Sequence, residues 1–134
     1  MAGYSGTPLP KKLGIKENGI VGLLAAPAGF ADLLEPLPAG VKLLSGVAGT
    51  RDVAVGFFVE RAEFERHLAA MRQAIAPAGG LWIAWPKKAS KVPTDMTEDV
   101  VREVALPTGL VDNKVCAIDD VWSALRLVIR RELR

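Results

Sequence analysis

The sequence predicts a three-layer α/β fold, in which helices cover both faces of a mostly parallel β-sheet, and three observations support this. Segments with the length of buried strands alternate with helical segments along the 134 residues, a pattern typical of parallel sheets. Residues 20–30 have the pattern of a buried strand that runs directly into a turn and a short helix. The two last strands, predicted over residues 111–118 and 122–130, are joined by so short a link that they favour an antiparallel hairpin.

The first half of the chain is expected to hold two short helices and three strands. Thr7 is a candidate cap for the first helix, with Pro8 at its first position and Gly14 at its end. About seven residues join the second strand to the third, fewer than the dozen that a parallel crossover usually needs. Either this connection is extended or the second strand runs antiparallel, and both alternatives remain open. The predicted strands are residues 20–25, 41–44 and 52–59, and the second helix is residues 30–34.

The second half contains the clearest helix of the chain. Phe64, Leu68, Met71 and Ile75 recur at spacings of four, three and four and form one apolar stripe. Pro77 and the Gly79–Gly80 pair are expected to end this helix before a strand over residues 81–85. A basic loop over residues 87–93 follows, and Asp95 and Glu98 match the capping box of a last helix.

Composition limits the class of protein. Half of the residues are apolar, which predicts one folded domain over residues 1–134. A formal charge of +2 is too small to indicate nucleic-acid binding. The single Cys116 cannot form an internal disulfide. The longest apolar run, residues 20–31, falls short of the ~20 residues that span a bilayer. We therefore expect a cytoplasmic protein without membrane association.

The loop after the first predicted strand is where a nucleotide-binding α/β fold carries its glycine-rich turn. Residues 25–30 read Ala-Ala-Pro-Ala-Gly-Phe, with Gly29 as the one glycine. Glycines let the backbone approach a ligand closely, whereas alanine adds bulk and proline also removes an N–H donor. The pattern therefore predicts a pocket without predicting a cofactor.

The order of elements resembles a class I S-adenosylmethionine-dependent methyltransferase. A helix, the motif Leu13-Gly-Ile-Lys-x-x-Gly19, an apolar strand and a glycine-containing turn open the chain. Later come a strand led by Asp52, an amphipathic helix, a strand that ends in Pro86, a further helix and a terminal hairpin. The resemblance covers most of residues 10–131. It implies a Rossmann-like sheet in which the hairpin adds an antiparallel strand, with S-adenosylmethionine as the cofactor.

This sequence departs from the methyltransferase pattern in three ways. The glycine-rich loop is reduced to Gly29, and the second strand ends in Leu43-Leu-Ser-Gly46 without an acidic residue for the ribose hydroxyls. The chain is also short, as if one strand–helix unit were missing. A closer resemblance is to a family of short bacterial proteins catalogued as a domain of unknown function. It rests on Leu81-Trp-Ile-Ala-Trp-Pro-Lys-Lys88, Lys114-Val-Cys-Ala-Ile-Asp119 and Trp122-Ser-Ala-Leu-Arg126, and also on Tyr4-Ser-Gly-Thr-Pro-Leu9 and Gly109-Leu-Val-Asp112.

Ligands of open α/β sheets lie outside the carboxyl ends of the strands, so we expect the site at that edge. The amide end of the helix that starts at Phe30 is expected to face the same place and to favour an anion. Trp85 is a candidate for stacking on the ligand. The candidate ligand-binding residues are Pro27, Ala28, Gly29, Glu60, Trp85, Pro86, Lys87 and Lys88.

Other chemistry-bearing residues have structural interpretations. Trp82 and Trp85 lie three positions apart on a strand and are expected on opposite faces. His67 flanks the apolar stripe and is expected to pack rather than to catalyse. Cys116 is expected to be a buried, inert thiol. Arg126, which shares a strand face with Arg130, is either exposed or an anion ligand. No catalytic residue is assigned, and one histidine with one cysteine cannot form a structural zinc site.

These observations lead to two functional hypotheses. The first is a non-catalytic binding or regulatory module that takes a small anionic ligand, uses no cofactor, and forms a homodimer through an outer strand or helix. The alternative is a minimal enzyme, such as a methyltransferase, that uses S-adenosylmethionine or another nucleotide cofactor. Nucleic-acid binding through the basic loop is the least favoured.

Overall fold

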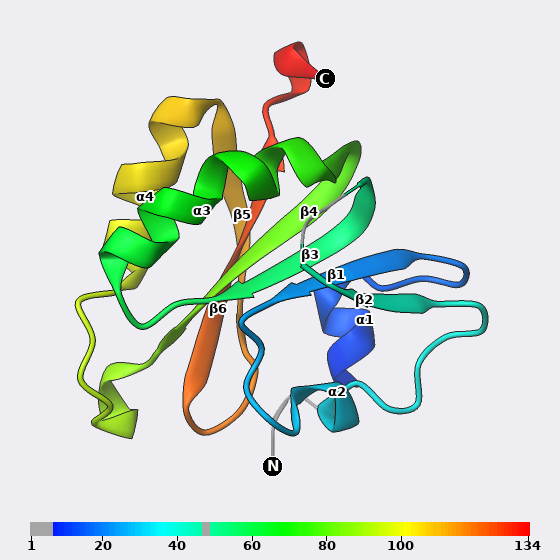
Figure 1. Ribbon diagram of the computed structural model, residues 1–134, viewed down its shortest axis with the longest axis horizontal. Helices are drawn as coiled ribbons and strands as arrows, with labels where there is room; N and C mark the ends of the chain where they lie inside the picture. The colour runs from blue at the N-terminus through cyan, green and yellow to red at the C-terminus, as the bar shows by residue number, and fades with distance from the viewer. Residues whose placement is uncertain (1–6, 47–48) are drawn as a thin grey trace.

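The computed structural model describes residues 7–46 and 49–134. Two parts of the predictions lie outside the described residues. They are residues 4–6 of the motif Tyr4-Ser-Gly-Thr-Pro-Leu9, and residues 47–48 of the link between strands two and three. The described chain forms a six-stranded sheet in the order β2-β1-β3-β4-β6-β5 (Figure 1). The strands are β1 (Ile20–Leu24), β2 (Lys42–Ser45), β3 (Arg51–Phe57), β4 (Ile75–Pro86), β5 (Leu110–Ala117) and β6 (Trp122–Ile129).

Helices cover both faces of this sheet, so the predicted three-layer α/β fold is confirmed. One face carries the short helices α1 (Leu9–Leu13) and α2 (Phe30–Leu33), and the other carries α3 (Arg61–Ala74) and α4 (Glu98–Ala105). Single 3-10 turns follow β4, α4 and β6, namely η1 (Lys88–Ser90), η2 (Leu106–Thr108) and η3 (Arg131–Leu133). No helix in the described part of the chain has the length and apolarity to cross a bilayer.

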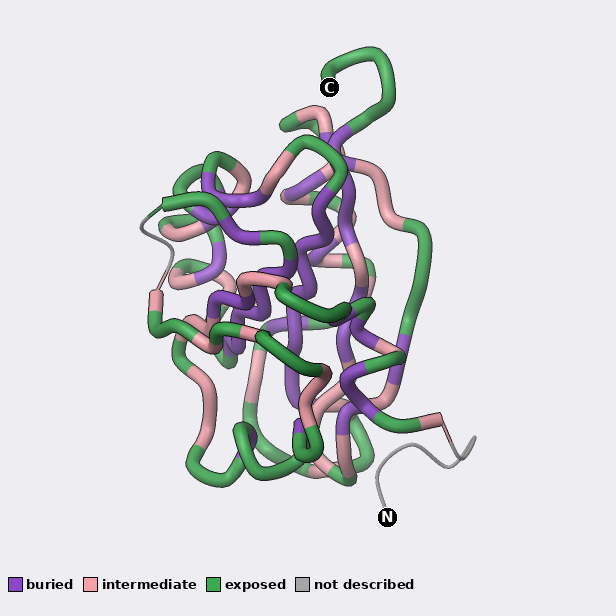
Figure 2. Tube along the Cα trace, turned by 90° about the vertical axis from the view of Figure 1, so that its right-hand side faces the viewer, coloured by how far each residue is buried: buried purple, intermediate pink, exposed green. Residues whose placement is uncertain are grey.

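The two apolar cores lie on opposite faces of the central strand β4, which is buried along most of its length. Figure 2 shows the buried segments gathered in the interior of the molecule. Because strand side chains alternate, Ile83 and Trp85 pack against α3 and α4, whereas Trp82 packs against α1 and α2. This confirms the prediction that the two tryptophans face opposite layers. The Trp82 indole Nε1 also donates a 3.0 Å hydrogen bond to the Leu13 carbonyl oxygen, which ties α1 to the middle of the sheet.

The open question about strand two is resolved, because β1 pairs in parallel with both β2 and β3. Strand two therefore runs parallel, and the antiparallel alternative is wrong. The described residues of the connection between β2 and β3 are Gly46, Gly49 and Thr50, and both glycines have a positive φ. The connection begins at Gly46, whose N–H bonds the Leu23 carbonyl oxygen at 2.7 Å. A Cβ atom added to Gly22 would lie only 2.9 Å from the Gly46 oxygen and 2.9 Å from Cδ of Arg51. Glycine at position 22 makes room for this crossover.

Antiparallel pairing of β5 with β6 and of β6 with β4 confirms the predicted C-terminal hairpin. Most predicted boundaries lie within one or two residues of the observed ones, but the start of the strand predicted over 81–85 is wrong by six residues. Helix α3 ends at Ala74 and β4 begins at Ile75, so residues 76–80 belong to an irregular part of the strand rather than to a loop. The strand begins early because Ile75 pairs with Arg51 before the register shifts.

The predicted caps are also corrected. Helix α1 begins at Leu9 with Pro8, not Thr7, at the N-cap position. Helix α4 is capped by Thr97, whose hydroxyl oxygen accepts a 3.1 Å hydrogen bond from the Val100 N–H. Asp95 instead accepts a 2.7 Å hydrogen bond from the Arg61 N–H, at the start of α3. The Asp95 carboxylate thus satisfies a free amide of a helix that is distant in sequence.

Candidate functional site

The edge of the sheet where β1 and β3 end is the point at which the chain order reverses. From β1 the chain moves to β2 on one side, and it then returns to β3 on the other side. Open α/β sheets bind ligands at such a point, outside the carboxyl ends of the strands. A cavity of about 180 Å³ lies there, which we call the switch pocket. Its lining residues are Leu24, Ala25, Phe57, Phe58, Val59, Glu60, Glu63 and His67.

The β1 side of the switch pocket is formed by a strained turn. Ala25 follows the last residue of β1 and has a φ of 57°, in the left-handed region. A side chain in this region costs about 1–2 kcal/mol, because the Cβ atom crowds the backbone carbonyl. Strained backbone of this kind clusters at functional sites. The chain therefore keeps the turn that glycine usually makes at this position, although it has alanine there.

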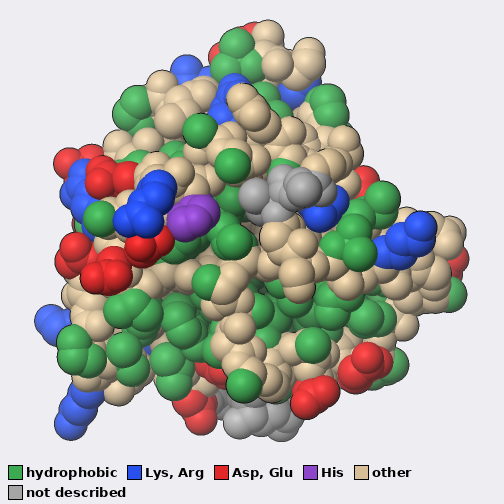
Figure 3. Space-filling model, in the orientation of Figure 1, with side chains coloured by type: hydrophobic (Ala, Val, Ile, Leu, Met, Phe, Trp, Pro, Cys, Tyr) green, Lys and Arg blue, Asp and Glu red, His purple; other side chains and the backbone are tan. Residues whose placement is uncertain are grey.

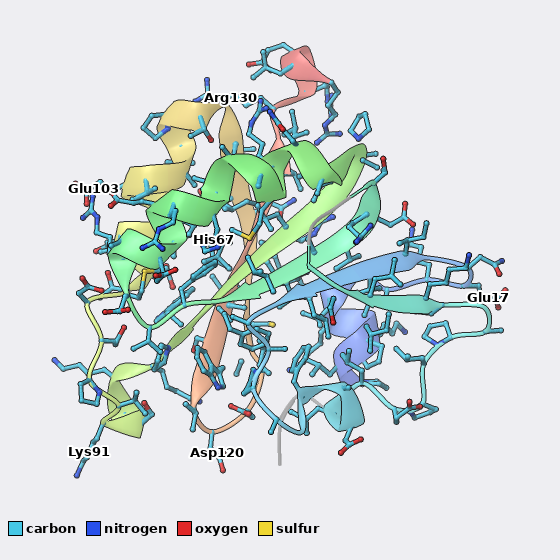
Figure 4. All side chains as sticks on the ribbon, in the orientation of Figure 1. Glu17, His67, Lys91, Glu103, Asp120 and Arg130 are labelled. Atoms are coloured by element: carbon cyan, nitrogen blue, oxygen red, sulfur yellow. The ribbon has the colours of Figure 1, made fainter. Side chains whose placement is uncertain are left out.

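The other side is provided by the first two turns of α3. Glu60 is the N-cap residue of α3, and Glu63 and His67 lie one turn apart on the helix, so all three line the pocket. His67 Nδ1 lies 2.9 Å from the Glu63 carbonyl oxygen and 3.7 Å from Oε2 of the same residue. The other Glu63 oxygen pairs with Arg66 Nη2 at 2.9 Å. Figure 3 shows the histidine among basic and acidic side chains on this face, and Figure 4 shows His67 on α3.

The structure distributes the predicted ligand-binding residues over different places. Glu60 lines the switch pocket. Trp85, Pro86 and Lys88 line a separate cavity of about 530 Å³ under the basic loop, which we call the loop cavity. Lys87 contributes its N–H to a 2.8 Å hydrogen bond with the Val121 carbonyl oxygen. Lys87, Pro27, Ala28 and Gly29 line neither cavity. Ligand binding by these residues stays a prediction.

The helix end at Phe30 that was expected to bind an anion is short, and anion binding there stays a prediction. Helix α2 is a single turn, and the Phe30 N–H already donates a 3.1 Å hydrogen bond to the Pro27 carbonyl oxygen. So short a helix has few aligned peptide dipoles to attract an anion.

Of the eight residues that line the switch pocket, only Glu60 was among the predicted ligand-binding residues. Ala25 was part of the predicted loop but not a candidate residue, and Glu63 and His67 were not assigned to the site. The sequence did place His67 correctly as partly packed, with its ring 6.1 Å from that of Phe58. The signal that could have found Glu63 and His67 is their helical spacing from Glu60, directly after a strand that ends at the site. The φ of Ala25 leaves no signal in the sequence, because alanine rarely adopts it. No group of three His, Cys, Asp or Glu side chains within residues 7–46 and 49–134 could hold a metal ion.

Comparison with known proteins identifies the fold. No family model and no curated protein matches the sequence. Among solved structures, an S-adenosylmethionine-dependent methyltransferase from Aquifex aeolicus matches with a TM-score of 0.62 at 15% identity, over 89% of this chain and 87% of the other. An N-methyltransferase from Bradyrhizobium japonicum WM9 matches with a TM-score of 0.59 at 14% identity, over 84% and 86% of the two chains. The magnesium protoporphyrin IX methyltransferase from Synechocystis PCC 6803, with bound SAH, matches with a TM-score of 0.62 at 10% identity, over 86% and 75%.

The match extends over most of both chains, and the mostly parallel sheet with its antiparallel C-terminal pair agrees with it. The resemblance to methyltransferases inferred from the order of elements is therefore confirmed at the level of the fold. The more specific resemblance to a bacterial family of unknown function stays a prediction. The chain has the Rossmann-like fold of S-adenosylmethionine-dependent methyltransferases.

Proposed function

We propose that this protein binds S-adenosylmethionine or a related adenosyl compound at the switch pocket. The observation that carries the proposal is the left-handed Ala25 at the end of β1, beside a pocket at the point where strand order reverses. The shared fold with three methyltransferases supports it. This reading favours the alternative hypothesis, use of S-adenosylmethionine, over a module without a cofactor.

The charge of the pocket suits this ligand. S-adenosylmethionine carries a positive sulfonium and a positive ammonium group, and both are attracted by carboxylates. Glu60 and Glu63 place two carboxylates at the pocket. These residues and the backbone at Ala25 would hold the ligand, and the bound cofactor would supply a transferable methyl group.

Two features suit S-adenosylmethionine less well, namely the volume of the switch pocket and the residues at the end of β2. A cavity of about 180 Å³ is below the ~300 Å³ of ordinary small-molecule sites. The strand β2 ends at Ser45 and is followed by Gly46, so no carboxylate is available there for ribose hydroxyls. The pocket as it stands encloses only part of the cofactor. The proposal is therefore one of binding, and no transfer step is derived from these residues.

Calorimetry with two ligands tests the proposal. S-adenosylhomocysteine lacks the sulfonium charge but has the same adenosyl group. We expect both ligands to bind, and we expect the Glu60→Gln/Glu63→Gln double variant to weaken S-adenosylmethionine more than S-adenosylhomocysteine. Because exposed ion pairs contribute about 0.2–1 kcal/mol, the loss should be up to about fivefold per carboxylate. Release of S-adenosylhomocysteine on incubation with an acceptor would extend the proposal from binding to methyl transfer.

The matched control is Glu65→Gln, on the same helix. Glu65 pairs with Arg61 at 3.3 Å and does not line the switch pocket, so this variant should bind both ligands as the parent does. Absence of heat with both ligands would refute the proposal. Equal weakening of both ligands by the double variant would refute the role of the carboxylates.

A second candidate function is binding of a small anion in the loop cavity. Two lysine side chains, Lys88 and Lys91, line this cavity beside Trp85. Inorganic phosphate should then raise the melting temperature, and Lys88→Ala should remove that increase while Lys42→Ala, at an exposed position on β2, should not. An increase that survives Lys88→Ala would exclude the loop cavity as its source.

A further inference from the structure

A third cavity lies at the opposite edge of the sheet, outside the amino ends of β1 and β3. It has a volume of about 400 Å³, within the range of small-molecule sites. We call it the amino-edge cavity. Its walls are residues 14–19, Asp52 of β3, the start of β4 and Arg126 of β6. In Figure 4, Glu17, which lies on its wall, is far from Lys91 and Asp120 at the other edge.

An irregularity in β4 hollows this edge. Ile75 pairs with Arg51 and Gly80 pairs with Val53, so the single residue Asp52 faces the whole segment 76–79. Extra residues on one strand form a bulge, and bulges are frequent next to functional sites. A Cβ atom on Gly79 would lie 2.7 Å from the Asp52 carbonyl oxygen, so glycine is needed where the bulge folds back onto β3.

Arg126 contributes a positive charge to the wall of this cavity. Its guanidinium lies across Gly80, where an added Cβ atom would be only 2.6 Å from Nε and 2.9 Å from Nη2. Within residues 7–46 and 49–134, its one hydrogen-bond partner is the Asn113 side-chain oxygen at 3.4 Å, and no carboxylate pairs with it. Burial and the positive charge of Arg134 lower the pKa of Arg126, as expected for a cation without a counter-ion.

Asp52 contributes a hydrogen-bond acceptor to the same cavity. One oxygen, Oδ2, accepts a 2.8 Å hydrogen bond from the Ile20 N–H at the start of β1. The other oxygen, Oδ1, has no hydrogen bond to the described residues. Asp52 is exposed, so this oxygen is accessible to a ligand. The cavity thus combines a guanidinium with unused donors and a carboxylate with an unused acceptor.

We propose that the amino-edge cavity binds a small organic acid that carries a hydroxyl or amino group beside its carboxylate. The planar guanidinium of Arg126 matches the two oxygens of a carboxylate. The hydroxyl or amino group donates to Asp52 Oδ1. This site lies at the opposite edge of the sheet from the switch pocket, so the inference is independent of the proposed function.

NMR titration with lactate, acetate and inorganic phosphate tests the inference on the intact chain. We expect lactate to shift the backbone amides of Gly79 and Gly80 and to leave those of Ala25 and Phe58 unchanged. Acetate lacks the hydroxyl group and should bind more weakly than lactate, and Asp52→Asn should reduce this difference. Phosphate should bind more weakly than lactate, and tighter binding of phosphate would overturn the choice of a carboxylate.

Arginine variants provide the control. Arg126→Gln should weaken lactate binding at least tenfold, whereas Arg130→Gln, at an exposed position just beyond β6, should have no effect. Arg126→Lys keeps the charge and provides a second variant if Arg126→Gln does not fold; it should bind lactate more weakly than the parent and more tightly than Arg126→Gln. The inference would be overturned if lactate did not shift the Gly79 and Gly80 amides of the parent chain. It would also be overturned if all arginine variants bound lactate with the same affinity.

Discussion

At the scale of single residues, Ala25 is the position where local preference and tertiary structure disagree most clearly. Alanine disfavours the left-handed region, yet the chain turns there at the end of β1. Its neighbours explain why the turn persists. Leu24 packs against one apolar core and Ala26 against the other, so the two residues are held on opposite faces. The residue between them has to accept the conformation that joins the two positions.

Replacement of Ala25 by glycine is therefore expected to stabilise the protein. Glycine adopts a positive φ without the steric cost, which should raise the free energy of unfolding by about 1 kcal/mol after the entropic cost of glycine is included. Urea unfolding of Ala25→Gly measures this gain. The control is Ala26→Gly, at a residue without a positive φ, which should destabilise the protein by about 0.4–1 kcal/mol. A loss of stability in Ala25→Gly would contradict the assigned backbone conformation.

At the scale of elements, the most unusual part of the fold is the connection between β2 and β3. Parallel strands normally need a crossover of a dozen or more residues, usually with a helix. Here residues 46–50 alone join the two parallel strands, and Gly46 at the start of this connection lies close to Gly22. Because of this close approach, residue 22 has no room for a side chain unless its neighbours move.

Gly22→Ala is expected to destabilise the fold by steric overpacking. The added Cβ atom would press on the Gly46 backbone oxygen, and relief of such overpacking typically costs about 1–3 kcal/mol. Thermal and urea unfolding measure the loss. Gly29→Ala is a useful comparison, because an added Cβ atom there meets no atom within 4 Å while φ is 87°. It should cost about 1–2 kcal/mol from backbone strain alone, and Gly22→Ala with parent-like stability would exclude the close crossover.

At the scale of the whole molecule, the stability of the protein should depend on pH because the Cys116 thiol is buried on the outer strand β5. Burial raises the pKa of the Cys116 thiol above its ordinary value of 9.0, although Lys12 and Lys114 oppose this in part. The folded state therefore holds the thiol proton more tightly than the unfolded chain does. This contribution to stability is complete below about pH 9 and is lost as the pH rises through the raised pKa of the folded state.

Unfolding in urea at several pH values tests this dependence. Above about pH 9, the free energy of unfolding of the parent should fall more steeply than that of Cys116→Ala, which has no thiol to titrate. The absolute stability of the variant does not matter, because only the slopes are compared. Parallel slopes for the two proteins would show that Cys116 ionises equally easily in the folded and unfolded states.

The two outer strands of the sheet bear on the predicted homodimer. β2 and β5 are the edges, and each exposes an apolar side chain, Leu44 at 40% and Val115 at 50%. Exposed strand edges can pair with another chain. Assembly through an outer strand stays a prediction, as does the cytoplasmic location.

The sequence predicted those elements of the fold whose patterns are local. The apolar stripe of α3 and the short link between β5 and β6 correctly indicated a helix and an antiparallel hairpin, because each depends on neighbouring residues. The Gly79–Gly80 pair was interpreted as the end of the helix, whereas it belongs to β4. These glycines belong to a bulged strand because Ile75 pairs with Arg51, which is distant in sequence.

The same distinction holds for the sites. Sequence pattern was sufficient for the α/β fold and for the place of Glu60 at the carboxyl edge of the sheet, because strand and helix periods repeat over a few residues. Ligand binding at this edge stays a prediction. The positive φ of Ala25, the cap that Asp95 provides to α3 and the presence of Asp52 and Arg126 in one cavity required the folded chain. Each depends on segments far apart in sequence, and their approach is set by packing across the sheet, which a local pattern does not contain.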